Sequence, residues 1–294
     1  MTRRSFITIT GTCPFGLKAG EIRLEVAYAG SMASVMEGPV KRAAAVELGF
    51  ALDGRAQGAS GLAQLIANRN IHPDVFISVT PSPMETVLRA GLAARAAAIA
   101  RTEMAIAYNP QSRFAGEFAR QPWWRVLEEP GLHFGRTDPV TDPQGRNIVF
   151  VLQLAERFYG RPGLARRVLG PDVNPRQIFS EPSVEARLQS GELDAASSYK
   201  IQPLAFHLPF AALPEEVNLG SLRRAAEYGQ ASLTLGGRTY HPEPLIYYAA
   251  ALKEAAHPEE AARFAGWLRG DSAQEIFRRS GYDPAEGAGE LRGS

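Results

Sequence analysis

The stretch that decides the fold is residues 137–147, TDPVTDPQGRN, which runs directly into the apolar-periodic segment 148–159. Proline is favoured at the first position of a helix, because its missing N–H would have no partner there. An aspartate just before it can accept hydrogen bonds from the free amides. The Asp142-Pro143 pair therefore predicts that a helix begins here, with Asp142 at its N-terminus.

Three other turns have the same character as this one. They are Gly30-Ser31, Ala59-Ser60-Gly61 and Ser180-Glu181-Pro182, each of which opens a helical pattern. A helix N-terminus presents unpaired N–H groups and a partial positive charge, both of which attract an oxyanion. If the four helix starts converge, they form a site for a small oxyanion.

The first hundred residues alternate strand and helix patterns. In chain order these cover 22–29, 32–48, 49–58, 62–68, 73–79 and 84–96. This βαβαβα rhythm predicts an α/β protein whose sheet is mostly parallel and carries helices on both faces. Ligands of such sheets lie beyond the carboxyl ends of the strands, where Ser31 and Ser60 fall.

The middle of the chain changes character and predicts a second lobe. A strand at 103–108 leads into it, and further strand patterns follow at 193–199 and 244–252. Two amphipathic helices near the C-terminus would pack back on the first lobe. We expect lobe one to comprise 22–107 and 253–284, lobe two 108–252, and a disordered tail 285–294.

Composition excludes several classes of function. With 294 residues, 45% of them hydrophobic, the chain can form two domains with real cores. The 32 Lys and Arg balance the 31 Asp and Glu, so no basic field favours nucleic acid. No apolar run reaches the roughly 18 residues of a membrane span.

The N-terminus resembles an export signal only in part. Residues 2–7, TRRSFI, look like a twin-arginine motif, but the apolar core after it is too short for a working signal. We predict that residues 1–21 are a leader or a disordered segment. Cys13 is the only cysteine, so no disulfide can form within the chain.

Taken together, the motifs resemble the molybdate/tungstate-binding proteins of ABC importers, in particular the archaeal subgroup, over about residues 22–283. Besides the serine turns, the segments that carry the resemblance are Asp142-Pro143-x-Gly145, VLQLAE at 151–156, SGELD at 190–194, Tyr199-Lys200 and LPEEVNL at 213–219. The resemblance implies a two-lobed periplasmic-binding fold of the second type. It also implies a periplasmic or extracellular monomer that delivers its anion to a membrane permease, without a cofactor.

The resemblance also implies the roles of individual residues. Ser31 and Ser60 would bind the oxyanion oxygens from lobe one, and Asp142 and Glu181 would be direct ligands of the metal centre from lobe two. Tyr199 would lie near the cleft. Where the family has Asp-Pro-Cys-Gly-Tyr-Arg, residues 142–147 read DPQGRN, which bears on the second-lobe geometry and the choice of anion.

Two carboxylates are the feature that distinguishes among anions. A carboxylate about 4 Å from a dianion is opposed by roughly 8 kcal/mol at an effective dielectric constant of about 20. Sulfate cannot offset this repulsion, because its sulfur stays four-coordinate. Molybdate and tungstate can, because a large, hard metal centre accepts extra oxygen ligands.

Simpler roles compete with these. Asp142, Ser31 and Ser60 are each explained by helix capping alone, Glu181 less well, and Tyr199 by core packing. Alternative functions are the same fold holding sulfate, phosphate or a small organic anion, a cytoplasmic sensor, or an enzyme. The sequence has no Gly-x-Ser-x-Gly elbow, no phosphate-binding Gly-Lys-Ser/Thr loop and no His-Glu pair on one helix, so we expect no catalysis.

Overall fold

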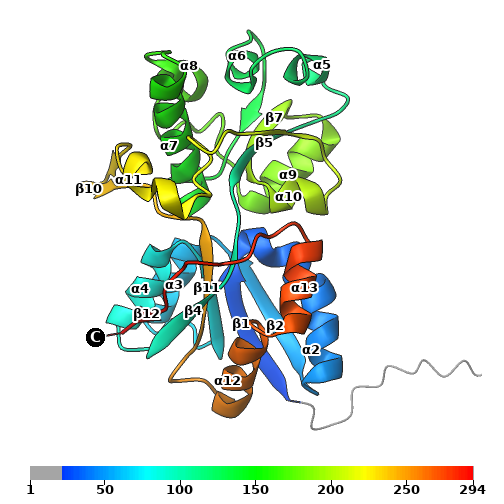
Figure 1. Cartoon of the computed structure of the whole chain (residues 1–294), viewed down its shortest axis with the longest axis vertical. Helices are drawn as coiled ribbons and strands as arrows, with labels where there is room; N and C mark the ends of the chain where they lie inside the picture. Colours follow the sequence, from blue (N-terminus) through cyan, green and yellow to red (C-terminus); the bar gives the residue numbers. More distant parts are fainter. Residues whose placement is uncertain (1–21, 294) are drawn as a thin grey trace, which may run out of the picture.

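The computed structural model describes residues 22–293, which form two lobes stacked along the long axis of the molecule (Figure 1). The leader or disordered segment that we predicted over residues 1–21 lies outside the described residues. The chain enters lobe one, crosses to lobe two, and returns to lobe one for its C-terminal segment. No helix in 22–293 is long and apolar enough to cross a membrane.

Lobe one contains the elements at the two ends of the chain. They are β1 (Arg23–Ala29), η1 (Gly30–Met32), α1 (Ala33–Val35), η2 (Met36–Val40), α2 (Lys41–Glu47), β2 (Ala51–Gln57), α3 (Ala59–Ala67), β3 (Val75–Val79), α4 (Pro81–Arg89), β4 (Arg95–Arg101), β11 (Ile246–Ala251), α12 (Pro258–Trp267), α13 (Asp271–Arg279) and β12 (Leu291–Arg292).

Lobe two contains the elements between them. They are β5 (Met104–Tyr108), α5 (Ala115–Phe118), α6 (Trp123–Leu127), β6 (Phe134–Gly135), α7 (Pro143–Phe158), α8 (Leu164–Leu169), α9 (Glu181–Ser190), β7 (Ala195–Tyr199), α10 (Ile201–Ala205), β8 (Phe210–Ala212), η3 (Leu222–Arg224), α11 (Ala225–Tyr228), β9 (Leu233–Leu235) and β10 (Arg238–Tyr240).

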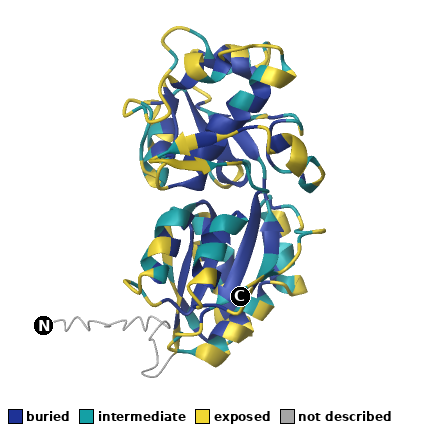
Figure 2. Cartoon of the chain, turned by 90° about the vertical axis from the view of Figure 1, so that its left-hand side faces the viewer, coloured by how far each residue is buried: buried dark blue, intermediate teal, exposed yellow. Residues whose placement is uncertain are grey.

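The sheet of lobe one has the order β12-β4-β11-β3-β1-β2 and buries both faces. Successive residues of β1 point to opposite sides, as the strand period of two requires. Leu24, Val26 and Tyr28 join a core cluster with α2, α12 and α13, whereas Ala27 joins a cluster with α3 and α4. Figure 2 shows these buried strands between the more exposed helices.

The α/β class is confirmed, and so is the mostly parallel direction of the strands. β1, β2, β3 and β4 run in one direction in lobe one, and β6, β7 and β8 run in one direction in lobe two. β1 pairs in parallel with β2 and β3, yet β11 pairs antiparallel with β3 and β4. In lobe two β5 pairs antiparallel with β7 and with β8, and the pair formed by β6 and β7 is parallel. The antiparallel strands β11 and β5 are the ones that connect the lobes, so they enter their sheets from the opposite end.

Strand pairing also moves the predicted boundaries. β5 belongs to the sheet of lobe two and β11 to that of lobe one. The tail is not disordered between 285 and 293, because β12 pairs with β4. The helix predicted over 84–96 ends at Arg89, and the Ala-rich segment after Gly91 is strand β4. Pairing with β11 there outweighs the helix propensity of alanine.

Helix α7 is central to lobe two, and its start depends on a close approach of the chain. Every residue from Pro143 to Leu152 is buried. A Cβ at Gly145 would lie 2.5 Å from the carbonyl oxygen of Thr137 and 2.6 Å from the backbone nitrogen of Pro139. Glycine is therefore required where the helix crosses the loop before it.

We expect Gly145→Ala to lower the free energy of unfolding by about 1–3 kcal/mol, because backbone atoms must move to admit the methyl group. Gly266→Ala in α12 is the matched control, since no atom lies within 4 Å of its Cβ position. That variant should gain about 0.5–1 kcal/mol. Urea denaturation monitored by circular dichroism measures both, and an unchanged midpoint for Gly145→Ala would contradict the packing described.

Candidate functional site

Asp142 is the N-cap of α7, as predicted. Its backbone is extended, with φ −124° and ψ 127°, and its Oδ1 accepts a hydrogen bond of 2.9 Å from the amide of Gln144. The side chain is 9% exposed and faces the β2–α3 loop of lobe one. A Cβ at Gly58 would lie 3.6 Å from the carboxyl carbon of Asp142, so the two lobes are in contact at this point.

Glu181 is the first residue of α9, and its side chain also reaches lobe one. Oε1 accepts a hydrogen bond of 2.9 Å from Gln202 Nε2. Oε2 lies against Gly30, so that a Cβ at Gly30 would collide with it. The carboxylate of α9 therefore packs on the turn that carries Ser31.

Burial acts on both acids, and the charge of Asp142 also acts on Glu181. Burial raises the pKa of Asp142, while the Gln144 amide and the charge of Arg146 oppose that shift. The pKa of Glu181 is raised well above its ordinary value by burial and then by the negative charges of Asp142 and Glu185. Asp142 and Glu181 are thus close enough to repel one another inside the closed cleft.

Gln202 holds the carboxylates in place. Its Nε2 donates to Glu181 and, at 3.0 Å, to Oε1 of Glu185, and its Oε1 accepts from the backbone amide of Tyr199 at 2.7 Å. Gln144 Nε2 donates a hydrogen bond of 3.0 Å to Oε1 of Gln202. The sequence analysis missed Gln202. The only sequence feature that bears on it is Gln144, which departs from the family pattern and donates a hydrogen bond to Gln202.

Tyr199 lies among the same groups, as the resemblance implied. Its hydroxyl oxygen accepts a hydrogen bond of 3.1 Å from Asn147 Nδ2. Burial, followed by the charge of Asp142, raises the pKa of Tyr199 well above its ordinary value, so the hydroxyl stays neutral. It can then donate a hydrogen bond to an anion.

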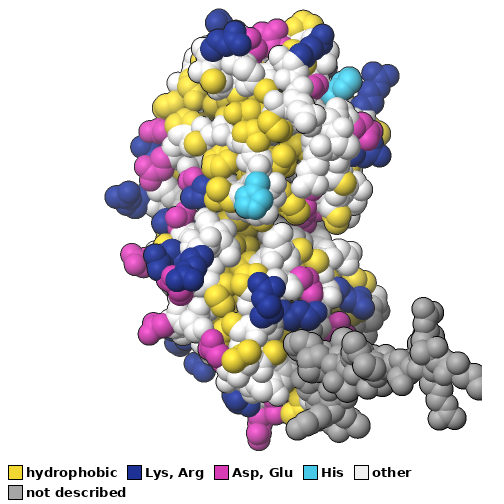
Figure 3. Space-filling view, turned by 90° about the vertical axis from the view of Figure 1, so that its right-hand side faces the viewer, with side chains coloured by type: hydrophobic (Ala, Val, Ile, Leu, Met, Phe, Trp, Pro, Cys, Tyr) yellow, Lys and Arg dark blue, Asp and Glu magenta, His cyan; other side chains and the backbone are white. Residues whose placement is uncertain are grey.

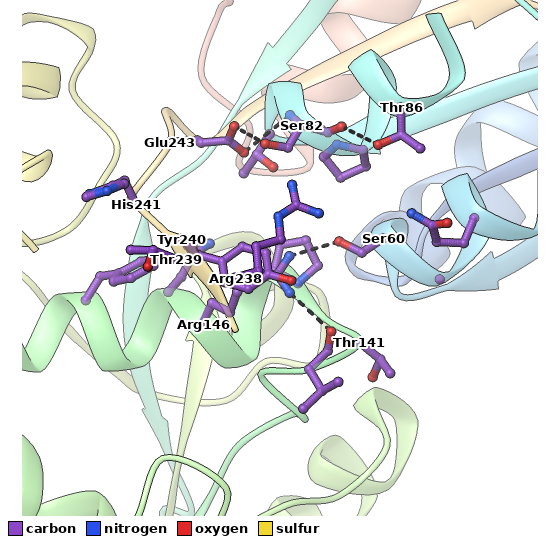
Figure 4. Close-up of a pocket in the computed structure, with 18 residues that line it drawn as sticks. Ser60, Ser82, Thr86, Thr141, Arg146, Arg238, Thr239, Tyr240, His241 and Glu243 are labelled. Carbon is purple, nitrogen blue, oxygen red and sulfur yellow. Dashed lines mark hydrogen bonds between the residues drawn. The ribbon is translucent and has the colours of Figure 1, made fainter. Parts of the chain in front are cut away.

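The two serines of lobe one are not helix caps, which contradicts their simpler interpretation. Ser31 lies inside η1 and its Oγ is 2.9 Å from the hydroxyl of Tyr247. Ser60 is the second residue of α3, where Gly58 occupies the cap position. Its Oγ accepts a hydrogen bond of 2.9 Å from Nη2 of Arg146, which joins the two lobes (Figure 4).

A single chain of contacts connects the five predicted residues. Ser60 accepts a hydrogen bond from Arg146, whose charge acts on Asp142. The charge of Asp142 acts on Glu181, Glu181 packs on the Ser31 turn, and the charges of both acids act on Tyr199. Within residues 22–293, no group of three or more His, Cys, Asp and Glu is placed to hold a metal ion. The site presents two carboxylates among hydroxyl and amide donors.

Sequence comparison identifies the family. The family described as bacterial extracellular solute-binding protein matches residues 24–283, which include every element from β1 to α13. The chain belongs to this family. The molybdate/tungstate-binding protein WtpA of Thermococcus kodakarensis is 29% identical to it over 207 residues, which are 63% of this chain and 58% of that protein. The chain thus spans less than two thirds of the length of this relative.

Solved structures share the fold of this solute-binding protein. The periplasmic molybdate-binding protein of Azotobacter vinelandii superposes with a TM-score of 0.60 at 19% identity, covering 88% of this chain and 98% of that one. The sulfate-binding protein SubI of Mycobacterium tuberculosis gives 0.61 at 12% identity, with 90% and 88% covered. The predicted two-lobed periplasmic-binding fold is therefore confirmed.

A cavity of about 430 Å³ opens beside Ser60 and Arg146 in the cleft of this solute-binding protein. The starts of α3, α4 and α7 and the β9–β10 hairpin form its walls (Figure 4). A second hollow on the Ser31 side is lined by Ile201, Leu204 and Tyr282 among others. Asp142 lines neither of these two cavities.

The raised carboxyl pKa values predict how stability varies with pH in the ligand-free protein. Burial raises the pKa of Glu185 to about 7, and the pKa of Glu181 is raised as well. The folded protein therefore binds these protons more tightly than the unfolded chain does. The stability that they contribute is complete below pH 4.5 and is lost as pH rises through about 7.

Glu181→Gln should therefore raise the ligand-free melting temperature at pH 8 by at least about 2 °C, the shift that roughly 1 kcal/mol produces in a chain of this size. At pH 5 the variant and the unmodified protein should melt closer together. Glu286→Gln, at an exposed position, is the control. Melting curves that run parallel from pH 5 to pH 8 would show that Glu181 is not buried beside Asp142.

Proposed function

We propose that this solute-binding protein captures molybdate or tungstate between its lobes, with Asp142 and Glu181 as ligands of the metal centre. One observation carries the proposal. Both carboxylates are buried in the closed cleft, the charge of Asp142 raises the pKa of Glu181, and both side chains lie against glycines of lobe one. Such an arrangement costs free energy unless a group that coordinates carboxylate oxygens lies between them.

The Coulomb argument selects the anion. Two carboxylates repel any dianion, by roughly 8 kcal/mol for one carboxylate at about 4 Å and an effective dielectric constant of about 20. A metal centre that expands its coordination shell forms bonds to carboxylate oxygens, which offset this repulsion. The name of the Thermococcus relative, a molybdate/tungstate-binding protein, supports the same choice.

Donors around the acids would bind the oxo groups. The hydroxyls of Ser31 and Ser60 come from lobe one, and the neutral hydroxyl of Tyr199 comes from lobe two. Arg146 adds a positive charge beside Ser60, at the position where the family pattern has tyrosine. Because the donors come from both lobes, the anion would be fully bound only when the cleft is closed.

Arg146 also supports a second candidate, a tetrahedral anion such as sulfate or phosphate that is held without coordination. Its guanidinium is 7% exposed and donates hydrogen bonds to the neutral oxygens of Ser60 and Pro139. A buried cation of this kind favours any small oxyanion. The two candidates differ in the role of Asp142 and Glu181. Their carboxylates would repel sulfate, whereas they would coordinate the metal of molybdate.

The role in the cell follows from the family. We infer that the protein acts outside the cytoplasm as a monomer, passes its anion to the permease of an ABC importer, and catalyses no reaction. Charged side chains of both signs are scattered over the face in Figure 3, which suits a protein that binds no nucleic acid.

Titration calorimetry with molybdate, tungstate and sulfate tests the proposal. We expect Asp142→Ala and Glu181→Ala each to weaken molybdate binding by more than about 100-fold, because each removes a direct ligand. Glu286→Ala is the control. Two outcomes would favour the second candidate. One is that Asp142→Ala leaves the affinity for molybdate unchanged. The other is that the unmodified protein does not bind molybdate and that Asp142→Ala improves its binding of sulfate.

Closure should depend on Gly30, since a Cβ there would collide with Glu181. Overpacking of this kind costs about 1–3 kcal/mol, so Gly30→Ala should weaken molybdate binding by roughly tenfold or more. Gly61→Ala, next to Ser60, is the matched control because its nearest neighbour lies at 3.6 Å. Equal affinities of the two variants would mean that the anion is bound without the contact between α9 and the Ser31 turn.

A further inference from the structure

Two arginines converge on one aromatic ring in the cleft. The guanidinium carbon of Arg146, on α7, lies 4.7 Å from the ring centroid of Tyr240, and that of Arg238 lies 4.9 Å from the same centroid. Arg238 and Tyr240 belong to the β9–β10 hairpin, which covers one side of the cavity (Figure 4). Two positive charges therefore lie close to one ring, and Arg238 has no role in the proposed oxyanion site.

A guanidinium group that lies over a tyrosine ring still carries N–H donors for hydrogen bonding. Arg146 uses part of its edge on neutral oxygens, those of Pro139 and Ser60. Arginine recognises a carboxylate or a phosphate through paired hydrogen bonds. The pair therefore forms a site for an oxyanion head group.

The opposite wall of the cavity already holds a carboxylate of the chain itself. Glu243 accepts a hydrogen bond of 3.3 Å from the amide of Ser82 in the first turn of α4 and a second one from its hydroxyl. This wall consequently binds carboxylate oxygens through a helix N-terminus. The negative charge of Glu243 also opposes any further anion that enters the cavity.

Size argues for an organic ligand. A volume of about 430 Å³ falls in the range of small-molecule sites, about 300–1,000 Å³, and far exceeds what a tetrahedral oxyanion needs. Tyr240 lines it together with four residues that carry hydroxyl groups, namely Ser60, Thr86, Thr141 and Thr239. These groups suit a ligand that carries hydroxyls of its own.

We propose that this cavity is a second subsite, which binds a small hydroxylated organic anion with its carboxylate or phosphate head between Arg146 and Arg238. The subsite adjoins the oxyanion site but does not need the metal anion to be bound. Hydrogen bonds from the two guanidinium groups hold the head, and the hydroxyl-lined wall holds the body. The proposal goes beyond the capture of molybdate.

Calorimetric titration of the full chain with citrate, glycerol 3-phosphate and inorganic phosphate tests it, with and without saturating molybdate. We expect citrate or glycerol 3-phosphate to bind in both conditions, and more tightly than phosphate because the body contributes. Citrate alone would identify a carboxylate head, and glycerol 3-phosphate alone a phosphate head. Arg238→Gln should weaken binding by about tenfold, the effect of one charge-assisted hydrogen bond.

Two further variants separate the subsite from general charge effects. Arg166→Gln removes an exposed arginine of α8 and should leave the titration unchanged. Glu243→Gln should strengthen binding several-fold, because it removes a competing charge, whereas a purely structural role would not increase affinity. Circular dichroism melting checks that each variant is folded.

Three outcomes would overturn the second subsite. They are no binding of either organic probe, equal affinity in Arg238→Gln, and loss of binding under saturating molybdate, which would place the probe in the oxyanion site. If molybdate itself does not bind, the proposed function fails. The dependence of probe binding on Arg238 then still decides whether the subsite exists.

Discussion

The structure depends on two buried acids that lie where the lobes meet. Asp142 and Glu181 come from different helices of lobe two, and each packs on a glycine of lobe one. Burial of like charges is unfavourable, and the raised pKa values of both groups reflect this cost. The surrounding donors, namely the Gln144 amide, Gln202 and the charge of Arg146, reduce that cost without removing it.

The fold brings these groups together through its two connections. β5 carries the chain into lobe two and β11 returns it, and each enters its sheet antiparallel to its neighbours. The helices that carry Ser31, Ser60, Asp142 and Glu181 then begin at the interface between the lobes. A ligand held there contacts both lobes, so its binding free energy stabilises the closed arrangement.

Local signals predicted much of this correctly. The Asp142-Pro143 pair sets the start of α7, and the serine turns fall at the starts of η1 and α3. The mostly parallel direction of the strands was predicted, but the reversed entry of β5 and β11 was not, because it depends on where the chain crosses between the lobes. The helix predicted over 84–96 extends too far, because the alanines after Gly91 have helical propensity and only sheet pairing makes the chain a strand from Arg95.

The sequence by itself determined the α/β class and the four helix starts, since caps, prolines and periodicity act within a few residues. The family resemblance, and not these local signals, implied the binding roles of Ser31, Ser60, Asp142, Glu181 and Tyr199. Only the tertiary structure decided that Arg146 reaches Ser60, that Gln202 joins the acids, and that Arg238 stacks on Tyr240 beside Arg146. These contacts join segments tens of residues apart. Their geometry follows from how the two lobes pack, which no local pattern encodes.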